Sequence, residues 1–269
     1  MSKSRIHTVS LKGFRETNED NSEIILNGDS RNNRMNNIDF YAIFDGHGGA
    51  EVSKYVKKHL PGDFIDKRVP YPLSKRYVTM VYDRIQKSLY KQKFAQTCGS
   101  TGLVVIIFRR GNKKYVNIIN NGDCRCILCR DNFALPLTKD HKPHWPEERL
   151  RIEKLGGKIV HDGHDWRIFS LSVSRSFGDL DSVPCVTHRP DLFRYVLDED
   201  DKFIVLGCDG LWDVLSNAAV VNFILSNCYD NTLQRRNINT NINMARLLAE
   251  YAIKKGSRDN ITITIIFLD

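Results

Sequence analysis

Residues 40–49 read Phe40-Tyr41-Ala42-Ile43-Phe44-Asp45-Gly46-His47-Gly48-Gly49, an apolar run that ends in an acidic residue and a glycine-rich turn. The pattern returns at residues 203–210, which end in Cys208-Asp209-Gly210, and in reverse where Asp259-Asn260 precedes the apolar residues 261–266. A carboxylate at a strand end costs folding energy if it is buried without a partner. Several such junctions in one chain therefore suggest a divalent cation between them.

Composition limits the class of protein. The chain has 269 residues, of which 41% are hydrophobic and 27% charged, with no apolar run of membrane-spanning length and no signal pattern at its start. We expect an intracellular protein of the cytoplasm or nucleus that does not bind membranes, and a monomer. Its length permits about two domains, but the acidic junctions run from Glu19 to Asp259, so one site requires both ends of the chain. A single domain spanning residues 1–269 is expected.

The seven cysteines are odd in number, and most lie inside apolar runs, as Cys124, Cys126 and Cys208 do. This distribution suits buried, reduced thiols better than a disulfide framework. We therefore expect a reducing compartment.

The net charge is +8, with basic clusters such as Lys54, Lys57 and Lys58. These clusters lie on the polar faces of expected helices or at a turn, without the interleaved aromatic residues typical of nucleic-acid binding. Attraction to phosphorylated or acidic protein substrates explains the charge equally well. No dedicated nucleic-acid binding is expected.

Three strand-like runs occupy the middle of the chain, at residues 103–108, 115–119 and 126–129. They are separated by Arg-Arg-Gly-Asn and Asn-Asn-Gly-Asp, which are hairpin turn signals, so we expect an antiparallel meander. Helical spacing appears at residues 52–60, 77–89, 220–224 and 244–251, and a further helix is expected to begin at Pro146 and to end at Gly156-Gly157. The Asn-rich stretches 27–37 and 230–243 are predicted to be surface loops.

Eight short motifs occur in an order that resembles one known family. They are Arg15-Glu16-Thr17-Asn18-Glu19-Asp20, Phe44-Asp45-Gly46-His47-Gly48-Gly49, Gly99-Ser100-Thr101, Asn121-Gly122-Asp123-Cys124-Arg125, Asp140-His141-Lys142-Pro143, Ser172-Val173-Ser174-Arg175-Ser176-Phe177-Gly178-Asp179, Cys208-Asp209-Gly210-Leu211-Trp212-Asp213 and Gly256-Ser257-Arg258-Asp259-Asn260. Together they cover nearly the whole chain and resemble the metal-dependent Ser/Thr protein phosphatases, the PPM or type 2C family.

The resemblance implies an α+β fold of two packed antiparallel β-sheets flanked by helices, a four-layer sandwich with a two-metal centre at one edge. By this resemblance Asp45 bridges both cations, and Asp209 and Asp259 complete the protein ligands of one of them. Glu19 and the Gly46 carbonyl bind the other. A weaker third metal position is implied at Asp123, Asp209 and Asp213.

Oxygen ligands suit Mg²⁺ or Mn²⁺, and a pair of such ions lowers the pKa of a bridging water towards about 7. Hydroxide is then available near neutral pH. The expected function is hydrolysis of phosphoserine and phosphothreonine on proteins by this metal-activated hydroxide, without a phosphoenzyme intermediate. Arg15 is the candidate phosphate clamp, because its planar fork can hold two phosphate oxygens. His47 is the candidate general acid, because its ordinary pKa of about 6.5 lies near the working pH.

Other interpretations of the same residues remain open at this stage. Each acidic residue could be an ordinary turn or surface residue. Cys124 to Arg130 has the Cys-x5-Arg spacing of cysteine-dependent phosphatases, although the intervening residues contain no glycine. The histidine pairs 141/144 and 161/164 could suggest zinc, with surface histidines as the alternative. Cys124, Cys126 and Cys129 could sense oxidation or could fill a core.

Two other classes of function are considered besides an enzyme. The first is a catalytically silent domain that binds phosphoproteins, which would typically have lost a metal ligand, and the second is a nucleic-acid-binding protein. The chain departs from the family pattern at Arg167-Ile168-Phe169-Ser170, where an Asn-Gly turn is usual, and at Cys124, Cys126 and Gly207. No ligand is lost by these changes, so we expect activity to survive them.

Overall fold

The computed structural model describes residues 6–26, 38–66, 68–229 and 242–268. The expected loop at 27–37 lies outside the described residues, as does the expected loop at 230–243 except for Ile242 and Asn243. Within the described part of the chain, no helix combines the length and apolarity that a membrane span requires.

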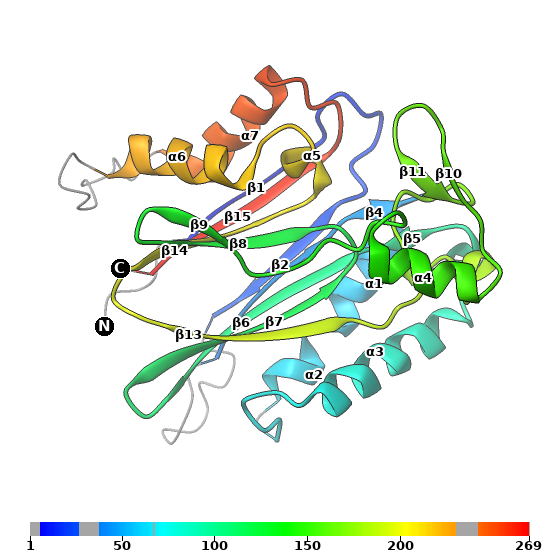
Figure 1. Cartoon of the computed structure of the whole chain (residues 1–269). Coiled ribbons are helices and arrows are strands. Elements are labelled where there is room, and N and C mark those ends of the chain that lie inside the picture. The colour runs from blue at the N-terminus through cyan, green and yellow to red at the C-terminus, as the bar shows by residue number, and fades with distance from the viewer. Residues whose placement is uncertain (1–5, 27–37, 67, 230–241, 269) are drawn as a thin grey trace.

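Two five-stranded antiparallel sheets lie at the centre of the molecule (Figure 1). The first sheet consists, in spatial order, of β1 (Ile6–Leu11), β15 (Ile261–Phe267), β14 (Asp201–Gly207), β8 (Arg125–Arg130) and β9 (Phe133–Pro136). The second consists of β13 (Asp191–Leu197), β7 (Lys113–Asn121), β6 (Gly102–Arg110), β3 (Asp39–Phe44) and β2 (Asn21–Ile25).

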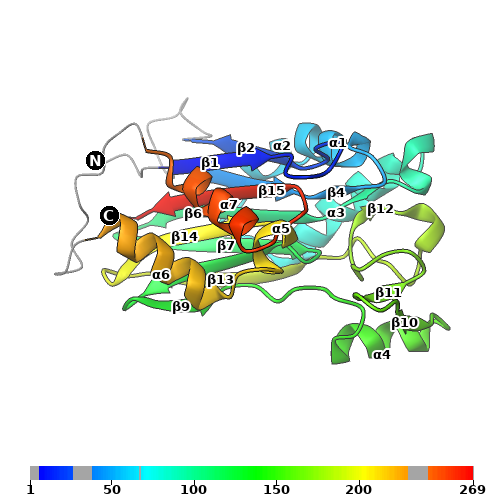
Figure 2. The same ribbon diagram turned by 90° about the horizontal axis from the view of Figure 1, so that it is seen from above.

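Helices cover the outer face of each sheet, as the view from above shows for α6 and α7 over the first sheet (Figure 2). The first sheet carries α5 (Asp209–Trp212), α6 (Asn217–Cys228) and α7 (Met244–Lys254), and the second carries α1 (Glu51–His59), α2 (Gly62–Ile65) and α3 (Lys75–Leu89). The predicted helix at Pro146 is confirmed as α4 (Pro146–Lys154), which lies at one end of the sandwich beside β10 (Ile159–His161) and β11 (Trp166–Ile168).

Three buried clusters separate these layers. The residues of β3 show how: Phe40, Ala42 and Phe44 pack toward the helices, whereas Tyr41 and Ile43 pack between the two sheets. Side chains alternate across a strand, so a strand buried on both faces needs apolar residues at nearly every position. This explains the uninterrupted apolar runs in the sequence, and the four-layer α+β sandwich is confirmed.

The predicted meander is correct for its first hairpin and wrong for its second. Strands β6 and β7 pair from Gly102↔Asn121 to Arg110↔Lys113, but β8 pairs with β14 and β9 in the other sheet. Asn120-Asn121-Gly122-Asp123 therefore connects the two sheets and closes no hairpin. A side chain from a later segment fixes the backbone of this connection, because Gly122 donates its N–H to Nδ1 of His141 at 3.0 Å.

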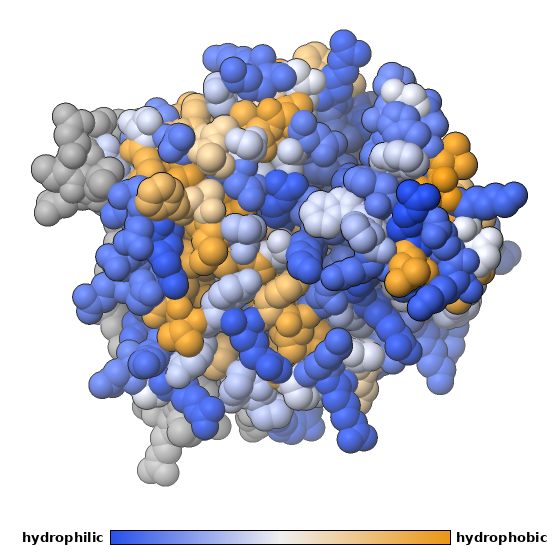
Figure 3. Space-filling view, in the orientation of Figure 1, coloured by the Kyte–Doolittle hydropathy of each residue, from blue (hydrophilic) through white to orange (hydrophobic). Residues whose placement is uncertain are grey.

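A third sheet is small and lies at the end of the sandwich where the acidic residues gather. It consists of β12 (Phe177–Gly178), β5 (Gly99–Ser100) and β4 (Gly46–His47), and two short 3₁₀ helices, η1 (Lys93–Gln96) and η2 (Leu180–Ser182), lie close to it in sequence. On the opposite part of the face seen in Figure 3, apolar side chains gather over β9 and β13, where Phe133, Leu135 and Val196 are exposed.

Candidate metal centre

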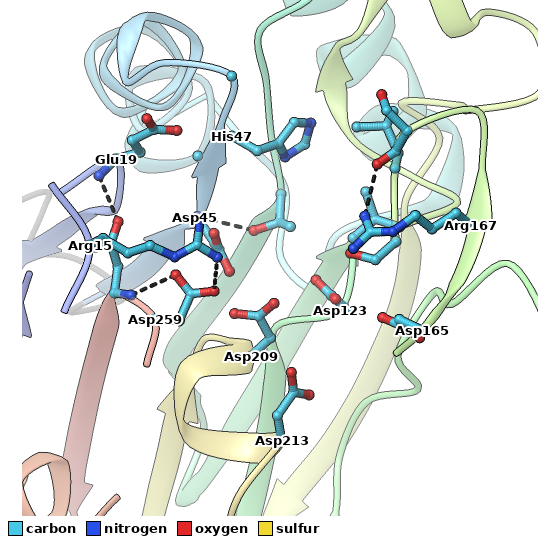
Figure 4. A pocket seen from close by; sticks show the side chains of 18 of the residues that line it. Arg15, Glu19, Asp45, His47, Asp123, Asp165, Arg167, Asp209, Asp213 and Asp259 are labelled. Carbon is cyan, nitrogen blue, oxygen red and sulfur yellow. Dashed lines mark hydrogen bonds and ion pairs between the residues drawn. The ribbon is translucent and has the colours of Figure 1, made fainter. Parts of the chain in front are cut away.

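The acidic residues predicted from the sequence come together where several strands end (Figure 4). Asp45 lies between β3 and β4, Asp209 follows β14 at the start of α5, and Asp259 precedes β15. Their carboxylates point into a cavity of about 790 Å³ that is also lined by Glu19 and the backbone of Gly46. The two sheets therefore contribute to one site, which local sequence patterns could suggest but not establish.

Oxygen atoms of Asp45, Asp123 and Asp209 lie within 4.8 Å of one another. A second group within the same limit consists of Asp20, Asp45 and Cys208, so Asp45 belongs to both. The position of Asp45 between two groups is compatible with the bridging role implied by the resemblance. Asp20 is a participant that the sequence analysis missed, although it stands beside Glu19 in the first motif.

The crowded carboxylates perturb one another. Burial, followed by the charges of Asp209, Asp20, Asp123 and Asp259, raises the pKa of Asp45 well above its ordinary value. Burial and the charges of Asp123 and Asp213 do the same to the pKa of Asp209, although Lys142 opposes the shift. Burial also raises the pKa of Asp20 to about 6, against the lowering effect of its hydrogen bond from Thr262. Mutual repulsion of this kind calls for a positive charge among the carboxylates.

The residues present fit a divalent cation. Oδ1 of Asp20 and Oδ1 of Asp123 are buried without a hydrogen-bond partner, so they are available as ligands. A Cβ at Gly46 would lie 2.5 Å from the Glu19 carbonyl oxygen, so glycine is what allows the two loops to approach this closely. Carboxylate and carbonyl oxygens form the donor set that Mg²⁺ and Mn²⁺ prefer.

Glu19 is fixed by contacts with segments distant in sequence. Its N–H donates to Oδ1 of Asn260 at 2.9 Å, its carboxylate accepts from Gly49 N–H at 3.0 Å, and its carbonyl accepts from the Ser53 hydroxyl at 2.5 Å. These bonds join the start of β2 to the start of β15 and to the loop before α1. They leave the Glu19 side chain on the cavity wall.

Arg15 lies at one side of the cavity, opposite Arg167 (Figure 4). Its guanidinium donates to Oδ2 of Asp259 at 2.6 Å, and 61% of its side chain is exposed. A charged and accessible fork at the cavity mouth suits an incoming phosphate.

His47 lies on the upper rim of the cavity (Figure 4). Its Nε2 is 2.7 Å from Oδ2 of Asp179. Burial lowers the pKa of His47, but the hydrogen bond and the charge of Asp179 raise it by more, so the net shift is upward. Asp179 was not identified as a site residue in the sequence, because it is distant from His47 along the chain.

The third implied position, at Asp123, Asp209 and Asp213, contains a positively charged side chain. Nζ of Lys142 lies 2.6 Å from Oδ2 of Asp123, and burial, which lowers the pKa of Lys142, is outweighed by Asp123, Asp209 and Asp213, which raise it. Lys142 belongs to the motif Asp140-His141-Lys142-Pro143, but nothing in the sequence indicated a role for it. The ammonium of Lys142 therefore already neutralises part of the negative charge of these carboxylates.

The cysteine-phosphatase interpretation does not agree with the geometry. Cys124 is fully buried with its Sγ 3.2 Å from the Thr101 hydroxyl, and burial raises its pKa well above the ordinary value. Arg130 lies at the far end of β8, where it binds Asp201. All seven cysteines are buried, as expected.

The histidine pairs do not form a zinc site in the described residues, since the side-chain groups with metal-ligand geometry there contain no histidine. His161 and His164 are exposed, as the alternative interpretation expected. His141 is buried and not on the surface, because its ring bonds Gly122 and Asp191.

The altered turn at residues 167–170 forms one wall of the cavity, which Arg167 and Ser170 line. Arg167 donates to the Ser170 carbonyl at 2.8 Å and also binds Asp162. Phe169 adopts φ of 55°, a left-handed conformation that is uncommon for a bulky residue. A glycine would adopt this conformation more easily, so Phe169 has a local conformational cost.

Comparisons with known proteins identify the family of the chain. The family model described as "Protein phosphatase 2C" matches residues 4–261. The chain is 35% identical to the integrin-linked kinase-associated serine/threonine phosphatase 2C of Bos taurus, over 97% of this chain and 75% of that protein. It is 47% identical to the PP2C-like domain-containing protein R307 of Acanthamoeba polyphaga mimivirus, over 58% of this chain and 95% of that protein.

Among solved structures, the serine-threonine phosphatase 2C of Toxoplasma gondii is similar with a TM-score of 0.77 and 23% identity. The similarity covers 98% of this chain and 94% of that one, and it concerns the fold. The family model and the Bos taurus relative extend over nearly the whole chain, including every loop that lines the cavity. The chain therefore belongs to the protein phosphatase 2C family.

Proposed function

We propose that this protein phosphatase hydrolyses phosphoserine and phosphothreonine on proteins at the cavity described above. The observation that supports this most directly is the convergence of Asp45, Asp209, Asp259 and Glu19 on one cavity with Arg15 at its mouth. The substrate class is supported by relatives that are named serine/threonine phosphatases.

Two divalent cations, Mg²⁺ or Mn²⁺, fit the site. Asp45 would contact both, Asp209 and Asp259 would hold one, and Glu19 with the Gly46 carbonyl would hold the other. When bound, the cations would supply water acidic enough to attack phosphorus near neutral pH and would stabilise negative charge on the phosphoryl oxygens. A weaker third ion is proposed at Asp123 and Asp213.

Arg15 and His47 would act on different parts of the phosphorylated substrate. The Arg15 guanidinium donates to Asp259 in this structure. When substrate binds, it would instead donate hydrogen bonds to two phosphoryl oxygens and so orient the phosphoryl group. His47 would give a proton to the leaving serine or threonine oxygen as the P–O bond breaks. No side-chain nucleophile is needed, and so we propose that no phosphoenzyme intermediate forms.

The other expectations are proposed on the same basis. We infer an intracellular, monomeric protein whose residues 1–269 act as one domain without dedicated nucleic-acid binding. Buried cysteines support the reducing compartment. Light scattering tests the monomeric state, and a salt-dependent duplex-binding assay without divalent metal tests the expected lack of nucleic-acid binding.

The first experiment measures phosphate release from a phosphothreonine peptide. We expect turnover with Mn²⁺ or Mg²⁺, none with EDTA, and a loss of at least about 100-fold in Asp209→Asn. Asp200→Asn is the matched control, because Asp200 is exposed and lies at the opposite end of β14. Thiol alkylation should leave the activity intact.

If the folded, metal-loaded protein releases no phosphate from several phosphopeptides, the proposed phosphatase activity is wrong. Binding of the same phosphopeptides without turnover would instead favour the catalytically silent phosphoprotein-binding domain.

A further inference from the structure

The three-stranded sheet of β12, β5 and β4 holds one of the proposed reactive groups. Strand β5 lies between β4 and β12, and Gly99 pairs with His47 on one side and with Gly178 on the other. His47 and Asp179, which follows Gly178, therefore flank the same glycine although they are 132 positions apart in the chain. Three strands of two residues each are enough to bring these two side chains together.

Gly99 leaves the space in which the two side chains meet. A Cβ at this position would lie 2.1 Å from Oδ2 of Asp179 and 2.4 Å from Nε2 of His47, both far below contact distance. These are the two atoms that are joined at 2.7 Å. The absence of a side chain at residue 99 is therefore a requirement of the His47–Asp179 pair.

Asp179 is held in place independently of His47. It adopts a left-handed backbone with φ of 46°, its side chain is 2% exposed, and its N–H donates to the Cys98 carbonyl at 3.1 Å. The Ser176 hydroxyl donates to the same oxygen, Oδ2, that contacts His47. A buried, strained carboxylate with a fixed orientation is typical of a residue selected for its position.

A side chain of α3 supports the backbone next to Asp179. The buried side chain of Gln86 donates to the Gly178 carbonyl at 2.9 Å and accepts from the Gly178 N–H at 2.9 Å. Both backbone groups of the residue before Asp179 are thereby satisfied by one amide. The β12 turn is consequently fixed relative to the helices as well as to β5.

We propose that Asp179 is the positioning residue for His47: its carboxylate accepts a hydrogen bond from Nε2–H, which leaves Nδ1 to face the phosphate cavity. The inference rests on the proposed role of His47 as proton donor. Nδ1 makes no hydrogen bond within the described structure, whereas Nε2 is engaged by the carboxylate. The Nε2 proton stays on the ring, hydrogen-bonded to Asp179, throughout. Only the Nδ1 proton passes to the leaving oxygen.

The proton balance of this step is simple. As the P–O bond breaks, its electron pair remains on the serine or threonine oxygen, which takes the Nδ1 proton and leaves as the alcohol. The imidazolium becomes a neutral imidazole in the Nε2–H tautomer, which the carboxylate stabilises. Water returns a proton to Nδ1 before the next turnover.

The kinetic test compares two leaving groups. A phosphothreonine peptide releases an alkoxide that needs a proton, whereas p-nitrophenyl phosphate releases a stable phenolate that does not. We expect His47→Gln to lower kcat for the peptide by about 100-fold or more, and Asp179→Ala by about 10- to 100-fold. Both should change kcat for p-nitrophenyl phosphate by less than about threefold. Asp181→Asn is the matched control, because Asp181 is exposed and lies two positions away.

The outcomes separate the inference from the function on which it rests. If His47→Gln loses equal activity on both substrates, the role of His47 as proton donor is wrong. If His47→Gln is selective for the peptide but Asp179→Ala is not, the proton donor stands and the positioning role of Asp179 is wrong. Selective loss in both variants, with Asp181→Asn unchanged, supports the inference.

A measurement on the wild-type protein without metal keeps the test valid if Asp179→Ala fails to fold. The ¹⁵N signals of the His47 ring, assigned by their loss in His47→Gln, report which nitrogen carries the proton when the ring is neutral. We expect the Nε2–H tautomer in the wild type and a mixture of tautomers in Asp179→Ala. An Nδ1–H tautomer in the wild type would overturn the inference.

Discussion

Lys142 shows how a single side chain can set the affinity of a metal position. Its ammonium lies 2.6 Å from Asp123, inside the position implied for a third cation. A cation entering there must displace the ammonium or tolerate its charge, and each 1.4 kcal/mol of repulsion weakens binding about tenfold. The third position is therefore expected to be weak because of Lys142 and not because ligands are missing.

Replacing Lys142 by methionine keeps an unbranched side chain that is one atom shorter and removes the charge. We expect the weakest Mn²⁺ site of Lys142→Met to bind about tenfold more tightly than in the wild type, as measured by electron paramagnetic resonance of free and bound Mn²⁺. Lys139→Met is the control, because Lys139 pairs with Glu147 on the surface. Weaker Mn²⁺ binding in Lys142→Met would mean that the lysine organises Asp123 and does not compete for it.

At the scale of elements, α5 and β15 must pack closely to bring Asp209 and Asp259 into one site. A Cβ at Gly210 would lie 2.0 Å from the Asn260 carbonyl oxygen, which belongs to backbone and cannot rotate away. The Ser257 hydroxyl also donates to the Gly210 carbonyl at 2.6 Å. The glycine in the Asp-Gly pair thus serves the contact between two elements.

We expect Gly210→Ala to lose about 1–3 kcal/mol in the free energy of unfolding, measured with urea, because the backbone must move apart. Mn²⁺ affinity should fall in the same variant, since Asp209 and Asp259 separate. Gly62→Ala provides the comparison, because its Cβ would meet nothing within 4 Å. Equal stability of Gly210→Ala and the wild type would show that the close approach is not required.

Helix α4 is attached to the rest of the protein by a buried ionic cluster around Glu148. Burial raises the pKa of Glu148, but its bonds with Arg175 and Arg151 outweigh this effect and lower the pKa to about 2. The carboxylate also accepts from the Ser174 hydroxyl at 2.8 Å. This cluster joins α4 to the segment that leads into β12.

The lowered pKa of Glu148 fixes the sign of a pH dependence. Stability from this group is fully present above its unfolded value of 4.5 and is lost as the pH falls toward about 2. We expect Glu148→Gln to lose on the order of 3 kcal/mol at pH 7, and the difference from the wild type to shrink as the pH falls below about 4. Urea unfolding at both pH values is the measurement. A difference that does not change with pH would assign the loss to packing alone.

For the whole molecule, the candidate metal centre links the two ends of the chain. Glu19 precedes β2, Asp259 precedes β15, and both line the same cavity as Asp45. Cations that bind only this folded arrangement stabilise the entire protein, by about 2.7 kcal/mol at one hundred times the dissociation constant. Without cations, the same carboxylates repel one another.

The Tm should therefore rise when metal binds the wild type and, without metal, when one of the repelling charges is removed. We expect Mn²⁺ to raise the Tm of the wild type and to have little effect on Asp209→Asn. In EDTA, Asp209→Asn should melt at a higher temperature than the wild type, because one of the repelling charges is gone. A lower Tm for this variant in EDTA would contradict the repulsion argument, and Asp200→Asn again serves as the control.

Much of the architecture could be predicted from local patterns. The start of α4 at Pro146, the β6–β7 hairpin and the apolar runs of β3, β14 and β15 all depend on residues close in sequence. The second hairpin could not be predicted correctly, because Asn-Asn-Gly-Asp is a turn signal whether the chain pairs back or crosses to another sheet. Burial of β8 against β14 decided between these outcomes.

By itself, the sequence determined which acidic residues end the strands and, through the order of its motifs, which family they resemble. Only the tertiary structure decided that Asp20 is buried beside Asp45, that Lys142 neutralises Asp123 and that Asp179 contacts His47. The physical reason is that charge and hydrogen-bond partners act over a few ångströms in space, and the partner of His47 is 132 positions away in the chain.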